Sequence, residues 1–277
     1  MIKTKKEKIA LFFNSDRGIS VYKSLSKKYE LDIFLSKKNL KTNVKQFLKK
    51  RKSKFKIIKK INLDLIEKIK NKNYFLLISA GFPLIFPKKI LEIYKNKVIN
   101  LHAGPLPKYR GGSPLNWQII NGEKKISISI IRMSKELDQG PIYSEKSFKL
   151  KNVDTIKTVH KKVNSLFPLM INQVILKIRK KIEPKIQKNN FIKNYPQRSK
   201  KDGFIDWNKM DAIATYNFVR ALTKPYPGAF YFDNKIKIKT LFNCKISKKN
   251  PKLNPGQIFF SNGQKFIKCK KYSIKII

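Results

Sequence analysis

Cysteine and long apolar runs are both scarce in this sequence of 277 residues. Its two cysteines, Cys244 and Cys269, have neither the number nor the spacing of a zinc site, and we interpret them as buried structural thiols in a reducing compartment. The longest apolar stretch, residues 74–87, is interrupted by serine, glycine and proline and falls short of the roughly 18 residues that a membrane span requires. The apolar run at residues 9–13 is too short for the core of a signal peptide. We therefore predict a cytoplasmic protein with neither a membrane partner nor a metal.

Acidic residues are few, with 17 Asp and Glu against 64 Lys and Arg and a formal net charge of +47. Only seven of the basic residues are arginines, and the lysines are spread from Lys3 to Lys275. Because Lys, Ile, Asn and Phe all have AT-rich codons, a biased genome composition explains this charge without a polyanionic partner. Attraction to an anionic substrate is compatible with either explanation. The 41% hydrophobic and 12% aromatic content indicates a folded chain that forms one large domain or two smaller ones.

Short apolar runs alternate with helical patterns through the first 150 residues. This alternation predicts βαβ units and a doubly wound α/β domain with a parallel sheet. The expected strands are residues 8–13, 31–35, 55–58, 74–79, 98–101 and 126–132. The expected helices are residues 19–29, 43–50, 63–71, 87–94 and 114–121. Residues 14–18, after the first strand, lack the G-x-G-x-x-G fingerprint, which argues against a dinucleotide cofactor.

The second half of the chain predicts a long helix, a linker and a smaller unit. Apolar residues recur every three or four positions over residues 154–181, as in an amphipathic helix. The polar stretch that follows contains two prolines and is typical of a linker. The predicted domains are residues 1–182 and 202–277, joined by a linker at 183–201. In the smaller unit we expect a helix at 210–222 and strands at 230–232, 235–241, 257–260 and 265–268, with Asp233 and Asn234 in a hairpin turn.

The residues best suited to chemistry lie at the end of one predicted strand. Asn100 and His102 are two residues apart and so share one side of that strand, and Asp138 follows the next strand. An amide and an imidazole can donate hydrogen bonds to a developing oxyanion, while a carboxylate orients the imidazole and raises its basicity. This set suits attack on a carbonyl by direct transfer between two bound substrates. Two alternatives stay open: His102 as a core histidine, and Asp138 as a turn former.

The motifs around these residues resemble those of the folate-dependent N-formyltransferases. The resemblance is carried by Asn100-x-His102, Leu106-Pro107, Arg110-Gly111, Pro114, Trp117 and Leu137-Asp138-x-Gly140. It implies that 10-formyltetrahydrofolate formylates an amine, with Asn100, His102 and Asp138 as the catalytic residues. It also implies that residues 80–87 form a loop that binds the pterin ring.

In that loop, the resemblance assigns folate binding to Phe82, Leu84 and Ile85, together with Leu137 and Gly140. We expect the two segments to meet because each follows a strand of the predicted parallel sheet. The alternative for residues 80–87 is the plain end of a strand followed by the start of a helix.

The resemblance extends to the C-terminal part of the chain. Residues 202–207 and 219–229 are similar to the C-terminal domain shared by methionyl-tRNA formyltransferases and nucleotide-sugar N-formyltransferases. This implies a Rossmann-like formyltransferase domain followed by a small, β-rich, OB-like domain. Glycinamide ribonucleotide formyltransferases, which stop after the first domain, are disfavoured. The sequence departs from the family at Gly104-Pro105 and at residues 126–129, both on the acceptor side, which leaves the acceptor open.

Two features favour a small acceptor. Residues 36–43 lack the basic insertion that tRNA formyltransferases carry after the second strand, and the sequence ends at Ile277, soon after the strand near Ile267. We therefore expect a nucleotide-linked amino sugar. The residues expected near its entry path are Lys108, Tyr109, Arg110 and Trp117.

Initiator methionyl-tRNA is the alternative acceptor, since a basic surface also suits tRNA. A non-enzymatic, nucleic-acid-binding α/β module is a third hypothesis. The oligomeric state, a homodimer included, is left open.

Overall fold

The computed structural model describes residues 6–188, 194–233 and 237–277. The chain divides into two compact units between which it passes several times. The first unit comprises residues 1–110, 127–147 and 162–192, and the second comprises residues 111–126, 148–161 and 193–277. Within the described ranges, no helix combines the length and the hydropathy that crossing a membrane would take.

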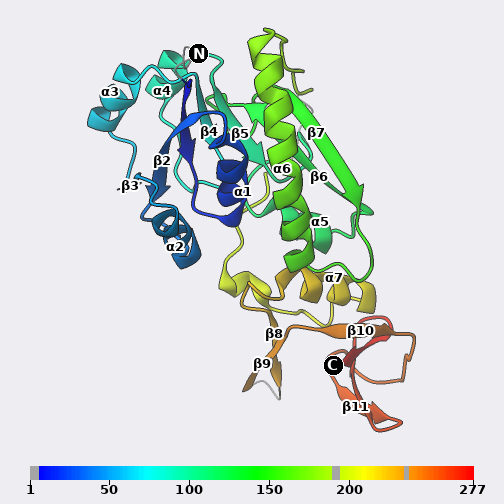
Figure 1. Ribbon diagram of the computed structural model, residues 1–277. Coiled ribbons are helices and arrows are strands. Elements are labelled where there is room, and N and C mark those ends of the chain that lie inside the picture. Colours follow the sequence, from blue (N-terminus) through cyan, green and yellow to red (C-terminus); the bar gives the residue numbers. More distant parts are fainter. Residues whose placement is uncertain (1–5, 189–193, 234–236) are drawn as a thin grey trace. The chain divides into compact units, whose positions relative to one another are not determined.

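The first unit is built on a seven-stranded sheet with the order β3-β2-β1-β4-β5-β6-β7 (Figure 1). The strands are β1 (Lys8–Phe12), β2 (Glu30–Ser36), β3 (Phe55–Ile58), β4 (Leu76–Ser79), β5 (Val98–His102), β6 (Lys125–Arg132) and β7 (Ile142–Lys149). The pairs from β3 to β5 are parallel. All six strands expected for this region are therefore present, and the doubly wound α/β class is confirmed.

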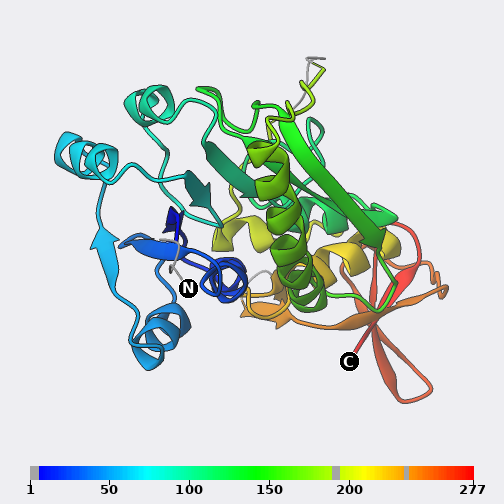
Figure 2. The same ribbon diagram turned by 45° about the horizontal axis from the view of Figure 1, so that its top comes forward.

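Helices cover both faces of this sheet. The bounds are α1 (Asp16–Leu25), α2 (Thr42–Lys50), α3 (Leu63–Asn71), α4 (Lys88–Ile93) and α6 (Ile156–Arg179). Helices α3 and α4 pack over one face, where Ile66 and Ile90 join a cluster with Phe12 of β1. Helices α1 and α6 cover the other face and are joined by Asn172, whose Nδ2 donates to the Ser24 hydroxyl at 2.8 Å (Figures 1 and 2).

The expectation of an entirely parallel sheet is wrong at β6. This strand runs antiparallel to β5, with Ile99 opposite Arg132 and His102 opposite Ser129. A parallel crossover must carry the chain back along the full length of a strand. The helix between the two strands, α5 (Pro114–Ile120), has seven residues and spans only about 10 Å. The chain therefore returns in the opposite direction.

The second unit combines two helices with two small sheets. Helix α7 (Ala212–Leu222) packs against α5, and the Asn116 side chain of α5 donates to the carbonyl of Ala221 at 2.8 Å. Strands β8 (Ala229–Asp233) and β9 (Lys237–Leu241) form the expected antiparallel pair, although residues 234–236 of the predicted turn lie outside the described residues. A four-stranded antiparallel sheet has the order β10-β13-β12-β11. Its strands are β10 (Cys244–Ser247), β11 (Ile258–Ser261), β12 (Gln264–Lys268) and β13 (Ser273–Ile276).

This unit has a core of its own, in which the side chains of Cys244 and Cys269 are both buried. Their interpretation as buried free thiols is confirmed. Burial raises the pKa of the Cys244 thiol to about 12, so it stays protonated at neutral pH. The predicted small β-rich unit at the C-terminal end is likewise present.

The domain boundaries at 182, 183–201 and 202 stay a prediction. Within the proposed linker, however, residues 185–187 pack against the first unit. Lys185 pairs with Ile142 at the start of β7 through two backbone hydrogen bonds of 2.7 and 2.9 Å. Gln187 is buried. Part of this polar segment is therefore built into the first unit.

Candidate active site

Strand β5 places Asn100 and His102 next to the carboxyl edge of the sheet. The strand lies between β4 and β6, so its backbone is hydrogen-bonded on both sides. Its sequence, Val-Ile-Asn-Leu-His, puts Asn100 and His102 on one side, as the period of two predicts. His102 is only 5% exposed, and Asn100 is half-buried.

The imidazole of His102 is held from both ring nitrogens. Its Nε2 lies 2.7 Å from the carbonyl oxygen of Tyr109. Because a carbonyl can only accept, Nε2 carries a proton and donates it to Tyr109. The other nitrogen, Nδ1, lies 3.4 Å from Oδ2 of Asp138. In the neutral imidazole, Nδ1 is therefore the atom with a free lone pair.

Asp138 reaches β5 from the loop between β6 and β7. It has a positive φ of 55°, an unusual conformation for a residue other than glycine. Its Oδ1 accepts a long hydrogen bond from Nδ2 of Asn100 at 3.4 Å, and its side chain is buried. The structure thus brings together Asn100, His102 and Asp138, which the sequence analysis had selected as candidate catalytic residues.

The path of this loop differs from the expectation. Because β6 is antiparallel, it ends beside the start of β5, where the amide of Met133 donates to the carbonyl of Val98 at 2.8 Å. The loop must therefore fold back toward the far end of β5 for Asp138 to meet Asn100 and His102. The reasoning that residues 137–140 follow a strand ending at the same edge as β4 is wrong, although Asp138 does reach β5.

Burial and a nearby cation set the protonation of His102. Burial lowers the pKa of His102 below its usual value, and the positive charge of Arg17 acts in the same direction. Asp138 and the Tyr109 carbonyl oppose this shift without cancelling it. Arg17 is fixed by a hydrogen bond of 2.8 Å to the carbonyl of Leu101 and by stacking on Phe167, 5.0 Å from the ring centre. His102 is thus a neutral base at pH 7.

The loop after β4 contains the three residues expected to bind folate. Phe82 is half-buried and packs edge-on against Phe12, with ring centres 5.4 Å apart. Leu84 is also half-buried, whereas Ile85 is 81% exposed. The loop begins at Gly81, whose φ of 74° and closeness to the Ser15 hydroxyl favour glycine.

The other two candidate folate residues lie in the β6–β7 loop and differ in exposure. Leu137 is 59% exposed, whereas Gly140 is buried. A Cβ atom on Gly140 would lie 1.7 Å from the carbonyl oxygen of Arg132, so the close backbone approach requires glycine. Gly140 fixes the shape of the loop, and Leu137 presents an apolar side chain on it.

The four residues expected near the acceptor have different surroundings. Lys108 is exposed and lies over the ring of Tyr109, 5.6 Å from its centre. Tyr109 is fully buried, and Arg110 is buried as well. Trp117 belongs to the second unit, where its indole N–H donates to the carbonyl of Pro196 at 3.0 Å. A role for these residues in acceptor binding stays a prediction.

Gln187 is a buried polar residue that the sequence analysis missed. Its side chain contacts Arg110 and the backbone of Asp138 and Gly140. It stands in a stretch of lysine, proline and polar residues that has no hydrophobic periodicity. No local signal distinguishes it from a solvent-exposed linker residue.

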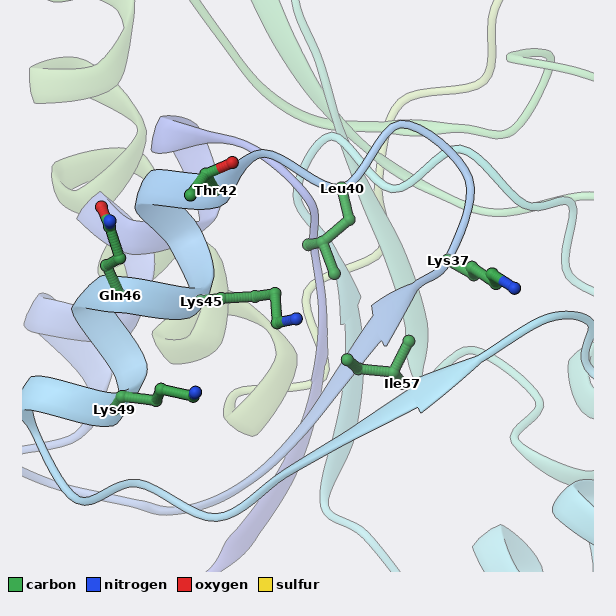
Figure 3. A pocket seen from close by; sticks show the side chains of 7 residues that line it. All are labelled: Lys37, Leu40, Thr42, Lys45, Gln46, Lys49 and Ile57. Carbon is green, nitrogen blue, oxygen red and sulfur yellow. The ribbon is translucent and has the colours of Figure 1, made fainter.

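A separate hollow of about 540 Å³ opens beside α2 (Figure 3). Lys45 and Lys49 extend from α2 over it, and the apolar side chains of Leu40 and Ile57 line it as well. It shares no residue with the Asn100, His102 and Asp138 cluster. Since about one residue in five of this chain is lysine, a lysine-lined hollow reflects the composition and does not by itself indicate a ligand.

Comparison with known proteins identifies the family. Residues 15–175 match the formyl transferase family, and residues 198–277 match the formyl transferase C-terminal domain. The chain belongs to the formyl transferase family and is an N-formyltransferase. The hypothesis of a non-enzymatic nucleic-acid-binding module is therefore wrong.

Two curated relatives exceed 30% identity. The bifunctional polymyxin resistance protein ArnA of Wigglesworthia glossinidia brevipalpis is 39% identical over 246 residues, which cover 88% of this chain and 36% of ArnA. The methionyl-tRNA formyltransferase of Caldanaerobacter subterraneus subsp. tengcongensis is 31% identical over 219 residues, covering 79% of this chain and 70% of that enzyme. The chain thus corresponds to little more than a third of the length of ArnA.

A solved structure shares the fold over the whole chain. The N-formyltransferase from Helicobacter canadensis, in complex with folinic acid and dTDP-3-aminofucose, matches with a TM-score of 0.71 and 18% identity. The match covers 99% of each chain. At this level of identity the likeness concerns the fold alone.

Proposed function

We propose that this chain transfers the formyl group of 10-formyltetrahydrofolate to a primary amine, with Asn100, His102 and Asp138 as its catalytic residues. The observation that carries the proposal is the buried His102, whose Nε2–H is held by the Tyr109 carbonyl and whose Nδ1 faces Asp138 beside Asn100. Family membership supports formyltetrahydrofolate as the one-carbon donor.

The residues suggest how the proton moves. As the amine attacks the formyl carbon, the neutral Nδ1 of His102 takes its proton, directly or through one water. The resulting imidazolium lies between the Tyr109 carbonyl and the Asp138 carboxylate, and both oxygens favour its positive charge. The bond from the formyl carbon to the folate nitrogen breaks, and His102 returns the proton to that nitrogen. One N–H is lost on the acceptor and one is gained on the folate.

Asn100 completes the set as an oxyanion donor. Its amide has two N–H groups, one of which makes the long bond to Asp138. The second can donate to the formyl oxygen as negative charge develops there. Imidazolium Nδ1–H can add a second hydrogen bond to the same oxygen. The folate ring would lie along the 82–86 loop and the 137–140 loop, where Phe82 and Leu137 offer apolar surface.

For the acceptor, we propose an amino sugar linked to a nucleoside diphosphate. The connection between β2 and α2 consists of residues 37–41 alone, which leaves no room for the basic insertion of the tRNA enzymes. A fold relative was solved with dTDP-3-aminofucose. The lysine-rich surface attracts a diphosphate. Initiator methionyl-tRNA is the second candidate, supported by the identity with a methionyl-tRNA formyltransferase.

The test is formylation of a panel of acceptors. The protein is incubated with 10-formyltetrahydrofolate and either amino-sugar nucleotides or charged initiator tRNA, and the product is detected by mass spectrometry. Formylation of a nucleotide-linked amino sugar at its free amine supports the proposal. Efficient formylation of the tRNA alone would replace the first acceptor by the second, and no transfer to any amine would refute the function itself.

A further inference from the structure

We propose that Gln187 is a positioning residue that holds the two loops on either side of His102. Its side-chain amide connects Arg110 with the backbone of Asp138 and Gly140, and we call these four residues the Gln187 clamp. The inference rests on the proposed role of His102 in formyl transfer. It assigns a function to a residue that lies outside the motifs of the sequence.

The hydrogen bonds of Gln187 fix the orientation of its amide. Oε1 accepts from Nε and Nη2 of Arg110 at 3.2 and 2.7 Å. Nε2 donates to the carbonyl of Asp138 at 2.9 Å and to that of Gly140 at 2.7 Å. A flipped amide would set donor against donor and acceptor against acceptor. Gln187 therefore uses its full hydrogen-bonding capacity, two donors and two acceptors, at a site that is only 6% exposed.

The clamp connects the partners of both nitrogens of His102. Arg110 directly follows Tyr109, whose carbonyl accepts from Nε2. Asp138 supplies the carboxylate opposite Nδ1. A single amide side chain thus fixes the spacing between the two groups that define which nitrogen of the imidazole carries the proton.

The clamp also explains how Asp138 keeps its unusual backbone conformation. A positive φ at a residue other than glycine costs free energy and persists only where its surroundings hold it. The hydrogen bonds of Gln187 to the carbonyls of Asp138 and Gly140 span this position. The segment carrying Gln187 is itself fixed by the pairing of Lys185 with Ile142.

Two variants separate the parts of the clamp. Gln187→Met preserves the length of the side chain and removes all four hydrogen bonds. Gln187→Glu keeps the acceptors for Arg110 and removes both donors to the loop of Asp138, and its new ion pair with Arg110 favours folding. The matched controls are Gln264→Met and Gln264→Glu, because Gln264 is exposed at the start of β12.

We expect both Gln187 variants to lower kcat by about 10- to 100-fold, since two loop hydrogen bonds are lost. The KM for 10-formyltetrahydrofolate should change little. Both Gln264 variants should match the unmodified protein.

A second readout reports directly on His102. The chain has two histidines, so the ring nitrogens of His102 and His160 can be resolved by NMR after ¹⁵N-histidine labelling. In the unmodified protein at pH 7.5, roughly one unit above the ordinary histidine pKa, His102 should show the tautomer protonated at Nε2. In Gln187→Met and Gln187→Glu, this signature should shift toward a mixture of tautomers, while His160 stays unchanged.

The two readouts distinguish the clamp from the proposed function. Variants that keep an unaltered His102 spectrum and normal kcat would overturn the clamp, whatever reaction the protein catalyses. An altered His102 spectrum supports the clamp even if no formyl transfer is found, whereas the function fails if His102→Ala transfers formyl normally. If Gln187→Met does not fold, Gln187→Glu decides.

Discussion

At the scale of single residues, the chemistry depends on how one imidazole is surrounded. His102 donates from Nε2 to a backbone carbonyl, which leaves Nδ1 to face Asp138. The sequence analysis assigned oxyanion binding to His102 without specifying a nitrogen. The geometry shows that only Nδ1 is available for chemistry, so the ring must act first as a base and only afterwards as a donor.

We expect Asn100→Ala, His102→Ala and Asp138→Ala each to reduce kcat by about 100- to 1,000-fold, the usual effect of removing a preorganised group that stabilises developing charge. Circular dichroism should show that the three variants fold. Asp64→Ala is the control, since Asp64 is an exposed residue of α3 paired with Lys68. Near-normal turnover of His102→Ala with folate and a productive acceptor would refute the catalytic assignment.

The pKa of His102 is the second residue-scale prediction. Because burial lowers this pKa, the folded protein binds the proton less tightly than the unfolded chain. His102 should therefore titrate below about 6.5, and the free energy of unfolding should decrease as the pH falls through that value. In Asp138→Asn the pKa should fall further, because Asp138 raises it in the native protein. NMR titration of the two histidines measures this, and a His102 pKa above 7 would contradict it.

At the scale of elements, two loops carry the folate prediction. Residues 82–86 follow β4, and residues 137–140 lie between β6 and β7. Folinic acid, as an analogue of the donor, should slow hydrogen exchange of the backbone amides in both loops. The measurement is hydrogen exchange with mass spectrometry at saturating folinic acid. Protection restricted to residues 202–277 would place the folate elsewhere and refute this assignment.

Gly140 permits a sharper test of the β6–β7 loop. A Cβ atom at this position would collide with the Arg132 carbonyl, which belongs to the backbone and can move only if the loop moves. Gly140→Ala should therefore destabilise the protein by about 1–3 kcal/mol and reduce kcat, because Asp138 is displaced with the loop. Gly263→Ala is the control, since Gly263 has a positive φ and nothing within 4 Å of its Cβ position. Equal effects of the two substitutions on kcat would contradict this explanation.

The sequence predicted the elements that follow simple patterns and missed those that depend on distant contacts. Helix α3 was predicted at its observed bounds because its apolar residues recur at helical spacing. Strand β7 was missed because it lies at the edge of the sheet and half of its residues are polar or charged. The direction of β6 and the burial of Gln187 depend on contacts between segments far apart in the chain, which no local pattern records.

The candidate site shows the same division. Asn100 and His102 could be placed together by the period of a strand, and Asp138 was added by the motif. The burial of Tyr109 and Arg110, two residues expected near the acceptor, could not be foreseen. Polar and aromatic residues in a loop rich in glycine and proline look exposed in the sequence, and only the partners of Arg110 explain why it is buried.

At the scale of the whole molecule, the formal net charge of +47 is the property that bears most on the acceptor. Such a charge attracts any anion, so affinity alone does not distinguish a sugar nucleotide from a tRNA. The number of phosphates in contact does. A diphosphate offers two phosphates, whereas the backbone of a nucleic acid offers many, each of which releases counterions when it is bound.

The salt dependence of acceptor binding should therefore identify the acceptor class. For an amino sugar linked to a nucleoside diphosphate, screening should weaken binding by less than about tenfold between 50 and 200 mM salt. For a nucleic acid making 6 to 10 phosphate contacts, the loss would be about 10³- to 10⁵-fold over the same range. Titration calorimetry at several salt concentrations measures the slope, with folinic acid bound to hold the protein in one state. A steep slope for initiator tRNA, joined to efficient formylation of its methionine, would exclude the sugar nucleotide as the principal acceptor, because a surface this basic binds any polyanion but formylates only the amine that reaches His102.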